Sequence, residues 1–147
     1  MKPIIIIFEG VDKSGKTTLL NMFNKITNFK YVVLDRFTTS SKVYDTMFKR
    51  HNREYFSRIE KNFFTNFDVI IVYCYCSTET SRRRLAEAGE VLQDEIDDID
   101  AVEAEFRKEL NLRQAIGDCK IIMVDTDRDL EECLYDIVRG VDEYDSI

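Results

Sequence analysis

The fold of this chain is decided by residues 4–17, which read IIIIFEGVDKSGKT. The segment begins with a continuous β-branched and aromatic run from Ile4 to Phe8, without the polar alternation of a strand that faces water. A turn containing Gly10 and Gly15 follows, and apolar residues then recur at helical spacing. A strand buried on both faces that leads through a glycine-rich turn into a helix predicts a parallel α/β unit.

The same alternation of strands and helices continues along the 147 residues. Apolar runs predict further strands at 31–34, 68–76 and 120–124, and helical spacing predicts helices at 16–27, within 41–64, and at 78–88, 96–110 and 130–138, before an acidic tail. No linker or internal repeat interrupts this pattern. We therefore expect a single α/β domain over residues 1–147, with a parallel sheet of about four strands and helices on both faces.

Composition excludes several classes of protein. The chain is 44% hydrophobic, which is enough to offset the entropy of ordering a core and excludes wholesale disorder. The net charge of −7 argues against a nucleic-acid partner. No apolar run reaches the roughly 18 residues needed to span a bilayer, so we expect no membrane association. The four cysteines form no C-x-x-C pair and are expected to be reduced core thiols, which favours a cytoplasmic location.

The glycine-rich turn carries a chemical signal. Residues 10–17, GVDKSGKT, match the pattern G-x-x-x-x-G-K-[ST], in the strand-to-helix position that the pattern requires. Glycines let successive backbone N–H groups point inward at a phosphate, and the N-terminus of the helix adds a favourable dipole. Lys16 is predicted to reach the β- and γ-phosphates of ATP, and the Thr17 hydroxyl to hold Mg²⁺. The sheet is thus expected to be of the P-loop NTPase type.

A second element is needed to bring a carboxylate to the metal. Asp35 follows directly after an apolar strand, and in a parallel sheet the carboxyl end of that strand opens beside the first loop. We therefore expect Asp35 to lie near Thr17 and to bind the metal with it. The neighbouring Arg36 is predicted to clamp phosphate oxygens.

These residues resemble the thymidylate kinase family in a shortened form. Residues 8–18, FEGVDKSGKTT, resemble its phosphate loop, most closely the eukaryotic and poxviral type, which carries a basic residue inside the loop. The sequence DRF at 35–37, with Ser40, Ser41 and Tyr44 after it, resembles the D-R-Y motif. Residues 68–79 resemble the next strand and the start of the lid helix, the lid falls at about 82–96, and residues 124–128 resemble the loop that cups adenine.

The resemblance implies a role for each matching residue. It implies catalysis by Lys13, Lys16, Asp35 and Arg36, and metal binding by Thr17 and Asp35. It implies binding of ATP and the acceptor by Gly10, Asp12, Lys13, Ser14, Gly15, Lys16, Thr17, Thr18, Thr126 and Asp127. Among these, Asp12 would accept a hydrogen bond from the acceptor 3′-hydroxyl, and Lys13 would supply positive charge in the transition state. Thr126 and Asp127 would contact adenine mainly through their backbone.

The chain departs from the family between the loop and Asp35. Thr17 and Asp35 lie only 18 positions apart, which leaves room for one helix and one strand. The family's additional strand and helices, which carry an acceptor-binding arginine and a phenylalanine that stacks on thymine, are therefore absent. We expect aromatic or basic residues of the segment 37–58 to replace them, notably Phe37, Lys42, Tyr44, Arg50 and Arg53.

The activity implied is ATP-dependent phosphoryl transfer to a deoxynucleoside monophosphate, with a dTMP-like acceptor favoured. Two alternatives stay open: a P-loop kinase of another acceptor (a nucleoside, a modified base or a polynucleotide 5′ end), and a nucleotide-binding protein with reduced catalysis. One of the three arginines at 82–84 is expected to serve the lid, His51 is expected in a helical apolar stripe, and a homodimer is expected along the aromatic helices.

Overall fold

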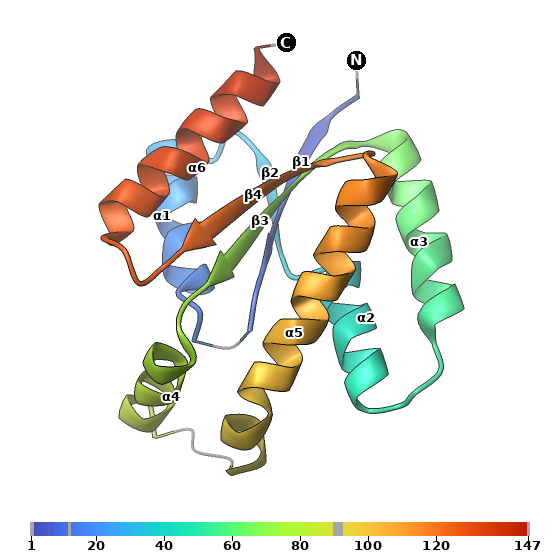
Figure 1. The fold of residues 1–147 in the computed structure, drawn as a ribbon. Coiled ribbons are helices and arrows are strands. Elements are labelled where there is room, and N and C mark those ends of the chain that lie inside the picture. The colour runs from blue at the N-terminus through green and yellow to red at the C-terminus, as the bar shows by residue number, and fades with distance from the viewer. Residues whose placement is uncertain (1, 12, 90–92, 147) are drawn as a thin grey trace.

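A computed structural model describes residues 2–11, 13–89 and 93–146 of the chain. The strands are β1 (Ile4–Glu9), β2 (Val32–Asp35), β3 (Asp68–Tyr75) and β4 (Lys120–Asp125). The helices are α1 (Lys16–Ile26), α2 (Thr38–Met47), α3 (Arg53–Asn66), α4 (Thr78–Glu87), α5 (Gln93–Ile116) and α6 (Leu130–Asp145). Figure 1 shows the alternation of strands and helices that the sequence predicts, and the α/β class is confirmed.

The four strands of the described residues form one parallel sheet in the order β2-β1-β3-β4. Strand β1 lies inside the sheet, where Phe8 pairs with Asp35 of β2 on one side and with Val72 of β3 on the other. Because all the strands run in the same direction, the loops after their carboxyl ends gather at one edge of the sheet (Figure 1). The loop and Asp35, which the sequence predicts to carry the functional site, lie at that edge.

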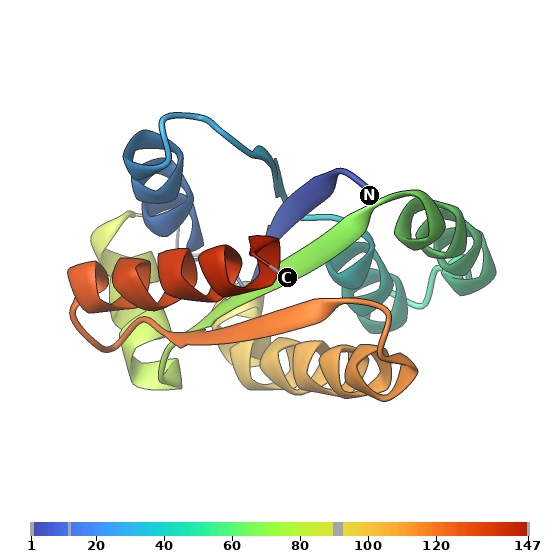
Figure 2. The ribbon, with the colours of Figure 1, turned by 90° about the horizontal axis from the view of Figure 1, so that it is seen from above.

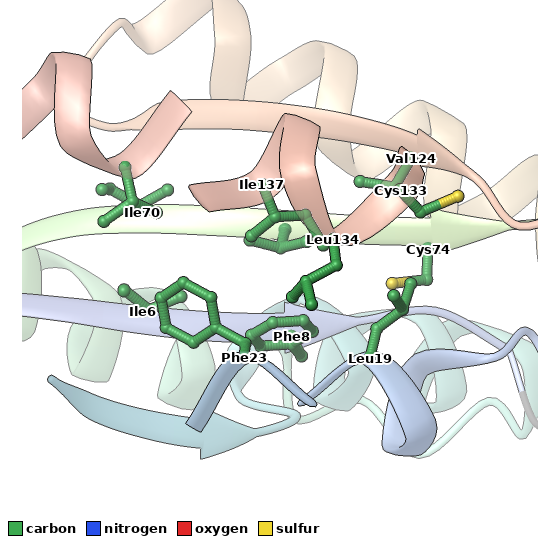
Figure 3. Packing of buried hydrophobic residues seen from close by; sticks show 12 residues of the cluster. Ile6, Phe8, Leu19, Phe23, Ile70, Cys74, Val124, Cys133, Leu134 and Ile137 are labelled. Carbon is green, nitrogen blue, oxygen red and sulfur yellow. The ribbon is translucent and has the colours of Figure 1, made fainter. Parts of the chain in front are cut away.

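Helices cover both faces of the sheet, as expected (Figure 2). On one face, Phe8 of β1 packs with Phe23 of α1 and Ile137 of α6 (Figure 3). On the other face, Ile7 packs in a second core with α2, α3 and α5, which includes Phe106. Successive residues of β1 therefore enter opposite cores, which is why its sequence is apolar without alternation.

The last helix is longer than the sequence predicts, because α6 continues through the segment expected to be an acidic tail. Val141 is buried and Tyr144 packs against the core, so the apolar repeat runs beyond residue 138. In the final turn, Asp145 accepts a hydrogen bond of 2.8 Å from the Tyr31 hydroxyl. The acidic residues of this segment occupy the outer face of a helix rather than a separate tail.

The interpretation of His51 as part of a helical apolar stripe is wrong. Helix α2 ends at Met47, and His51 is an exposed loop residue with a positive φ of 61°. The buried Asp45 shapes this loop: its carbonyl accepts from the Arg50 N–H at 3.0 Å and its carboxylate from the Asn52 N–H at 2.9 Å. These bonds turn the chain between α2 and α3 and explain the break.

Helices α2 and α3 bury only part of their aromatic residues. Phe64 is buried and packs in the second core, while Phe48 and Tyr55 are 62% and 64% exposed. Helical spacing alone therefore overestimates how many of these rings belong to the core.

None of the helices in the described part of the chain combines the length and apolar character that crossing a bilayer requires.

We predict that Phe23→Ala lowers the free energy of unfolding by about 3–5 kcal/mol, because it empties a buried site between two rings. The Phe23 ring lies 6.0 Å from those of Phe8 and Tyr31. In the control, Ile26→Ala, the side chain removed from the same helix is 62% exposed, and the change should stay within about 0.5 kcal/mol. Urea unfolding measures both; equal losses would contradict the assignment of the core.

Candidate functional site

The turn after β1 has the backbone conformation that its glycines predict. Gly10 has a φ of 150°, and a Cβ atom there would lie 2.4 Å from the Cys74 carbonyl oxygen. Gly15 has a φ of 85° and is the N-cap residue of α1. Between them, the Ser14 N–H donates to the Val11 carbonyl at 3.2 Å. Any larger residue at Gly10 would push the loop away from β3, so this glycine sets the position of the loop on the sheet.

Ser14 and Lys16 are buried in this loop. The Ser14 hydroxyl has no hydrogen-bond partner among the described residues. The Lys16 amine contacts the carboxylate of Asp35, which stands at the end of β2 opposite Phe8. Asp35 therefore reaches the loop at Lys16, the residue next to Thr17, and its binding of a metal together with Thr17 stays a prediction.

A pocket opens where the loop meets α1. We call it the loop pocket; its volume is about 590 Å³, within the range of small-molecule sites. Its lining residues are Val11, Lys13, Gly15, Lys16, Thr17, Thr18, Arg84, Glu87, Ala88 and Leu130. Several residues predicted to bind ATP therefore share one cavity at the N-terminus of a helix, where the backbone favours anions. Asp12 lies outside the described residues, as does part of the predicted lid, residues 90–92.

Thr126 joins β4 to the loop through its side chain. Its hydroxyl donates to the Ser14 carbonyl at 2.5 Å, and its N–H donates to the Tyr75 carbonyl at 2.7 Å. A Cβ atom on Gly15 would lie 3.1 Å from the Cβ of Thr126, so the absence of a side chain at Gly15 permits this approach. Contact of Thr126 with adenine stays a prediction; the described contacts make it a support of the loop.

The structure distinguishes among the three arginines of α4. Arg84 donates to the Lys13 carbonyl at 3.0 Å, and to the hydroxyl and the carbonyl of Thr126, each at 3.2 Å. Arg82 lies instead 3.9 Å from the carboxylate of Asp100 on α5, and Arg83 lies 3.9 Å from that of Glu87 on α4. The sequence could not choose among them because they are consecutive; contact with the loop selects Arg84.

Asp127 anchors the start of α4. Its carboxylate accepts a hydrogen bond of 2.8 Å from the Ser77 N–H. Hydrogen bonds from Thr80 and Ser77 hold the pKa of Asp127 below its ordinary value. The segment that the sequence assigned to adenine thus also fixes the helix from which Arg84 extends.

Glu9 is a buried carboxylate that the sequence reasoning treated only as part of the turn. It ends β1, and its oxygens accept hydrogen bonds from the Phe37 N–H at 2.5 Å and from the Ser40 hydroxyl. Burial raises the pKa of Glu9 from 4.5 to about 7, against the opposing effect of these bonds and of Arg36. A signal was present: an acidic residue closes an otherwise apolar run, directly before Gly10.

A second pocket lies beside Arg36. We call it the α2–α3 pocket; its volume is about 450 Å³. Its lining residues are Arg36, Phe37, Ser40, Ser41, Tyr44, Asp45, Phe48, Arg50, Asn52 and Phe56. The Arg36 guanidinium lies 5.8 Å from the centroid of the Tyr44 ring, and the Tyr44 and Phe48 rings are nearly parallel at 18°. Three expected replacement residues, Phe37, Tyr44 and Arg50, are therefore brought together.

The other two, Lys42 and Arg53, line a different cavity, of about 430 Å³. Lys42 is buried and pairs with Glu60, while Arg53 pairs with Glu109 of α5. Position on α2 explains the difference, because Lys42 and Ser41 are consecutive helical residues that face different directions. Their expected part in an acceptor wall is not supported by where they lie.

Comparison of the sequence with models of known protein families and with curated proteins gives no match. Solved structures do resemble it. The YorR protein of Bacillus subtilis, solved with phosphorylated GDP, has a TM-score of 0.70 and 22% identity, over 97% of this chain and 98% of that one. Deoxyadenosine kinase from M. mycoides with bound dCTP has a TM-score of 0.66 and 14% identity, over 95% and 99%. The chain therefore shares the fold of these two structures over nearly its whole length.

The raised pKa of Glu9 predicts a pH dependence of stability. The folded chain holds the proton with a pKa of about 7, and the ordinary value is 4.5. This stabilisation is fully present below the unfolded pKa and is lost as the pH rises through the folded pKa, by roughly 3 kcal/mol. Glu9→Gln removes the titration, so its free energy of unfolding should fall less between about pH 5 and pH 8. Urea unfolding across that range tests this; parallel curves for both proteins would contradict it.

Proposed function

We propose that the protein transfers the γ-phosphoryl group of Mg²⁺-bound ATP to a deoxynucleoside monophosphate, with a dTMP-like base favoured. The observation that carries this proposal is the contact between Lys16 and Asp35, which joins the phosphate loop to the strand that leads into Arg36. Two pockets adjoin these residues, one lined by the loop and one by Arg36. A donor and an acceptor can thus occupy neighbouring sites at one sheet edge.

In the loop pocket, the N–H groups of the loop and the amine of Lys16 would bind the triphosphate. The buried Ser14 hydroxyl, which has no partner among the described residues, also suits a loop that takes a polar ligand. Thr17 and Asp35 supply a hydroxyl and a carboxylate, the oxygen ligands that Mg²⁺ prefers. When bound, the ion would neutralise charge on the phosphates.

In the α2–α3 pocket, Arg36 would bind the acceptor phosphate at the end nearest the loop, and the aromatic lining would hold the base. An oxygen of the acceptor phosphate forms the new bond to the γ-phosphorus. The bond from that phosphorus to the β–γ bridging oxygen breaks, and ADP leaves with the electron pair. Because a phosphate dianion is already a nucleophile, the step requires placement and positive charge rather than a strong base.

Lys13 would add positive charge to the transferring group. Its backbone has a φ of 62°, and its carbonyl accepts a hydrogen bond from Arg84. The bond from Arg84 therefore ties the backbone of Lys13, a lining residue of the loop pocket, to α4. The role of Asp12 toward the acceptor 3′-hydroxyl stays an expectation from the family resemblance.

Transfer to a nucleoside is the second candidate. Only α1 lies between β1 and β2, so the acceptor side lacks the additional strand and helices expected of a thymidylate kinase. A structure of the same fold is that of a deoxyadenosine kinase. The shorter wall leaves room for an acceptor other than dTMP, such as a nucleoside.

A homodimer along the aromatic helices also stays a prediction. Phe48 and Tyr55 lie largely exposed on that side of the molecule. Sedimentation velocity would distinguish a dimer from a monomer.

Donor binding is tested by thermal shift with ATP in the presence and absence of Mg²⁺. ATP at about 100 times its Kd should stabilise the parent by about 2.7 kcal/mol. Lys16→Ala should abolish this gain, and Asp35→Ala should remove its dependence on Mg²⁺. Lys25→Ala, an exposed lysine in the last turn of the same helix, is the matched control and should retain the gain. Equal protection of the parent and Lys16→Ala would refute the role of Lys16.

The acceptor is tested by ADP release across all four deoxynucleoside monophosphates and the corresponding nucleosides. We expect turnover with monophosphates, highest with dTMP, and loss of at least about tenfold in Arg36→Ala, since one charge-assisted contact is removed. Turnover with nucleosides alone would favour the second candidate. Silence with every acceptor, in a protein that binds ATP, would refute both.

A further inference from the structure

The carboxylate of Glu9 caps α2, a helix that begins 29 residues later in the chain. Helix α2 begins at Thr38, and its N-cap residue, Phe37, gives no side-chain capping bond. Glu9 instead accepts the N–H of Phe37 at 2.5 Å and the hydroxyl of Ser40 in the first turn. A negative charge on Glu9 also interacts favourably with the positive end of the helix dipole. The last residue of β1 therefore fixes the first turn of α2.

Ser40 passes this constraint to Arg36. The Ser40 hydroxyl donates to Glu9 and accepts a hydrogen bond of 3.5 Å from the Arg36 guanidinium. Because the single proton of the hydroxyl is directed at the carboxylate, its lone pairs remain for the arginine. The Arg36 guanidinium also lies over the Tyr44 ring, 5.8 Å from its centroid. Glu9, Ser40, Arg36 and Tyr44 thus form one chain of contacts that ends in the α2–α3 pocket.

Strand β1, which ends in Glu9, also constrains the backbone of Arg36. Its N–H donates to the Phe8 carbonyl at 2.9 Å, and its φ is 71°, a left-handed conformation that residues other than glycine rarely adopt. Such a conformation persists when neighbouring contacts determine it on several sides. Here the contacts come from Phe8 and Glu9, directly before the phosphate loop.

We propose that Glu9 and Ser40 are positioning residues. They orient the Arg36 guanidinium toward the acceptor and fix its position relative to the phosphate loop. This inference rests on the proposed function, because it assigns Arg36 to the acceptor. Glu9 itself is fully buried and does not line the α2–α3 pocket, so it acts through Ser40 rather than on the acceptor. The two residues govern acceptor recognition and leave donor recognition to the loop.

Glu9→Gln is the sharpest variant, because it keeps the size of the side chain and reverses one hydrogen bond. With its carbonyl on the Phe37 N–H, the amide would donate to Ser40 and turn that hydroxyl toward Arg36. A hydroxyl proton facing a guanidinium repels it. We expect the KM for the acceptor to rise about tenfold, with the KM for ATP within about twofold of the parent. Ser40→Ala should shift the same constant in the same direction.

A double-mutant cycle separates positioning from general damage. In an Arg36→Ala background, Glu9→Gln should change the acceptor KM by less than about twofold, since its effect passes through the missing side chain. Glu60→Gln, which alters another buried carboxylate that lines neither pocket, is the control and should leave the ratio of the two KM values unchanged.

The outcomes are distinct. Absence of transfer by the parent would overturn the proposed function. Two results would overturn this inference alone, with transfer by the parent intact. The first is an unchanged acceptor KM in both Glu9→Gln and Ser40→Ala, and the second is full additivity of the effects in the double-mutant cycle. If Glu9→Gln does not fold, Ser40→Ala and its own cycle with Arg36→Ala decide. Amide hydrogen exchange provides a readout without activity. In Glu9→Gln the Phe37 N–H keeps a carbonyl acceptor and should retain its protection, whereas the Ser40 N–H, which also bonds to the Glu9 carboxylate, should lose protection.

Discussion

The parallel pairing of β1 with its two neighbours is the constraint on which the rest of this structure depends. It sets the end of β2 beside the loop that follows β1, so that Lys16 meets Asp35, and it sets Glu9 beneath the first turn of α2. On the other side, the close approach of Gly10 to Cys74 and of Gly15 to Thr126 seats the loop on β3 and β4. Each of these contacts spans a long distance in sequence, and each requires the strands to end at the same level.

The features that the sequence predicts well are those encoded locally. The apolar run before Gly10 predicts a buried central strand, and the spacing of Gly10, Gly15 and Lys16 predicts the loop, because strand burial and turn conformation depend on adjacent residues. Asp35 was expected beside the loop because the carboxyl ends of parallel strands open at one edge, and it contacts Lys16 there. The thymidylate kinase resemblance adds the assignment of roles, whereas the comparisons with solved structures show the shared fold alone.

The features that the sequence predicts poorly depend on which side of a helix a residue faces. Arg84 could not be separated from its neighbours, and Lys42 and Arg53 were grouped with Arg50 although they pair with glutamates in another cavity. His51 was assigned to a helix because the stop at Asp45 is made by backbone and side-chain bonds that no apolar spacing reveals. Glu9 was overlooked because its partners, Phe37 and Ser40, are distant in sequence.

The two pockets differ in how many parts of the chain build them. The loop pocket takes residues from the first loop, from α4 and from the start of α6, whereas all the lining of the α2–α3 pocket comes from residues 36–56. One uninterrupted stretch of the chain therefore carries that entire surface. Exchange of this stretch alone, by recombination or by design, would change the whole lining of this pocket and leave the residues of the loop pocket unchanged, which makes the architecture modular at the level of a single helical hairpin.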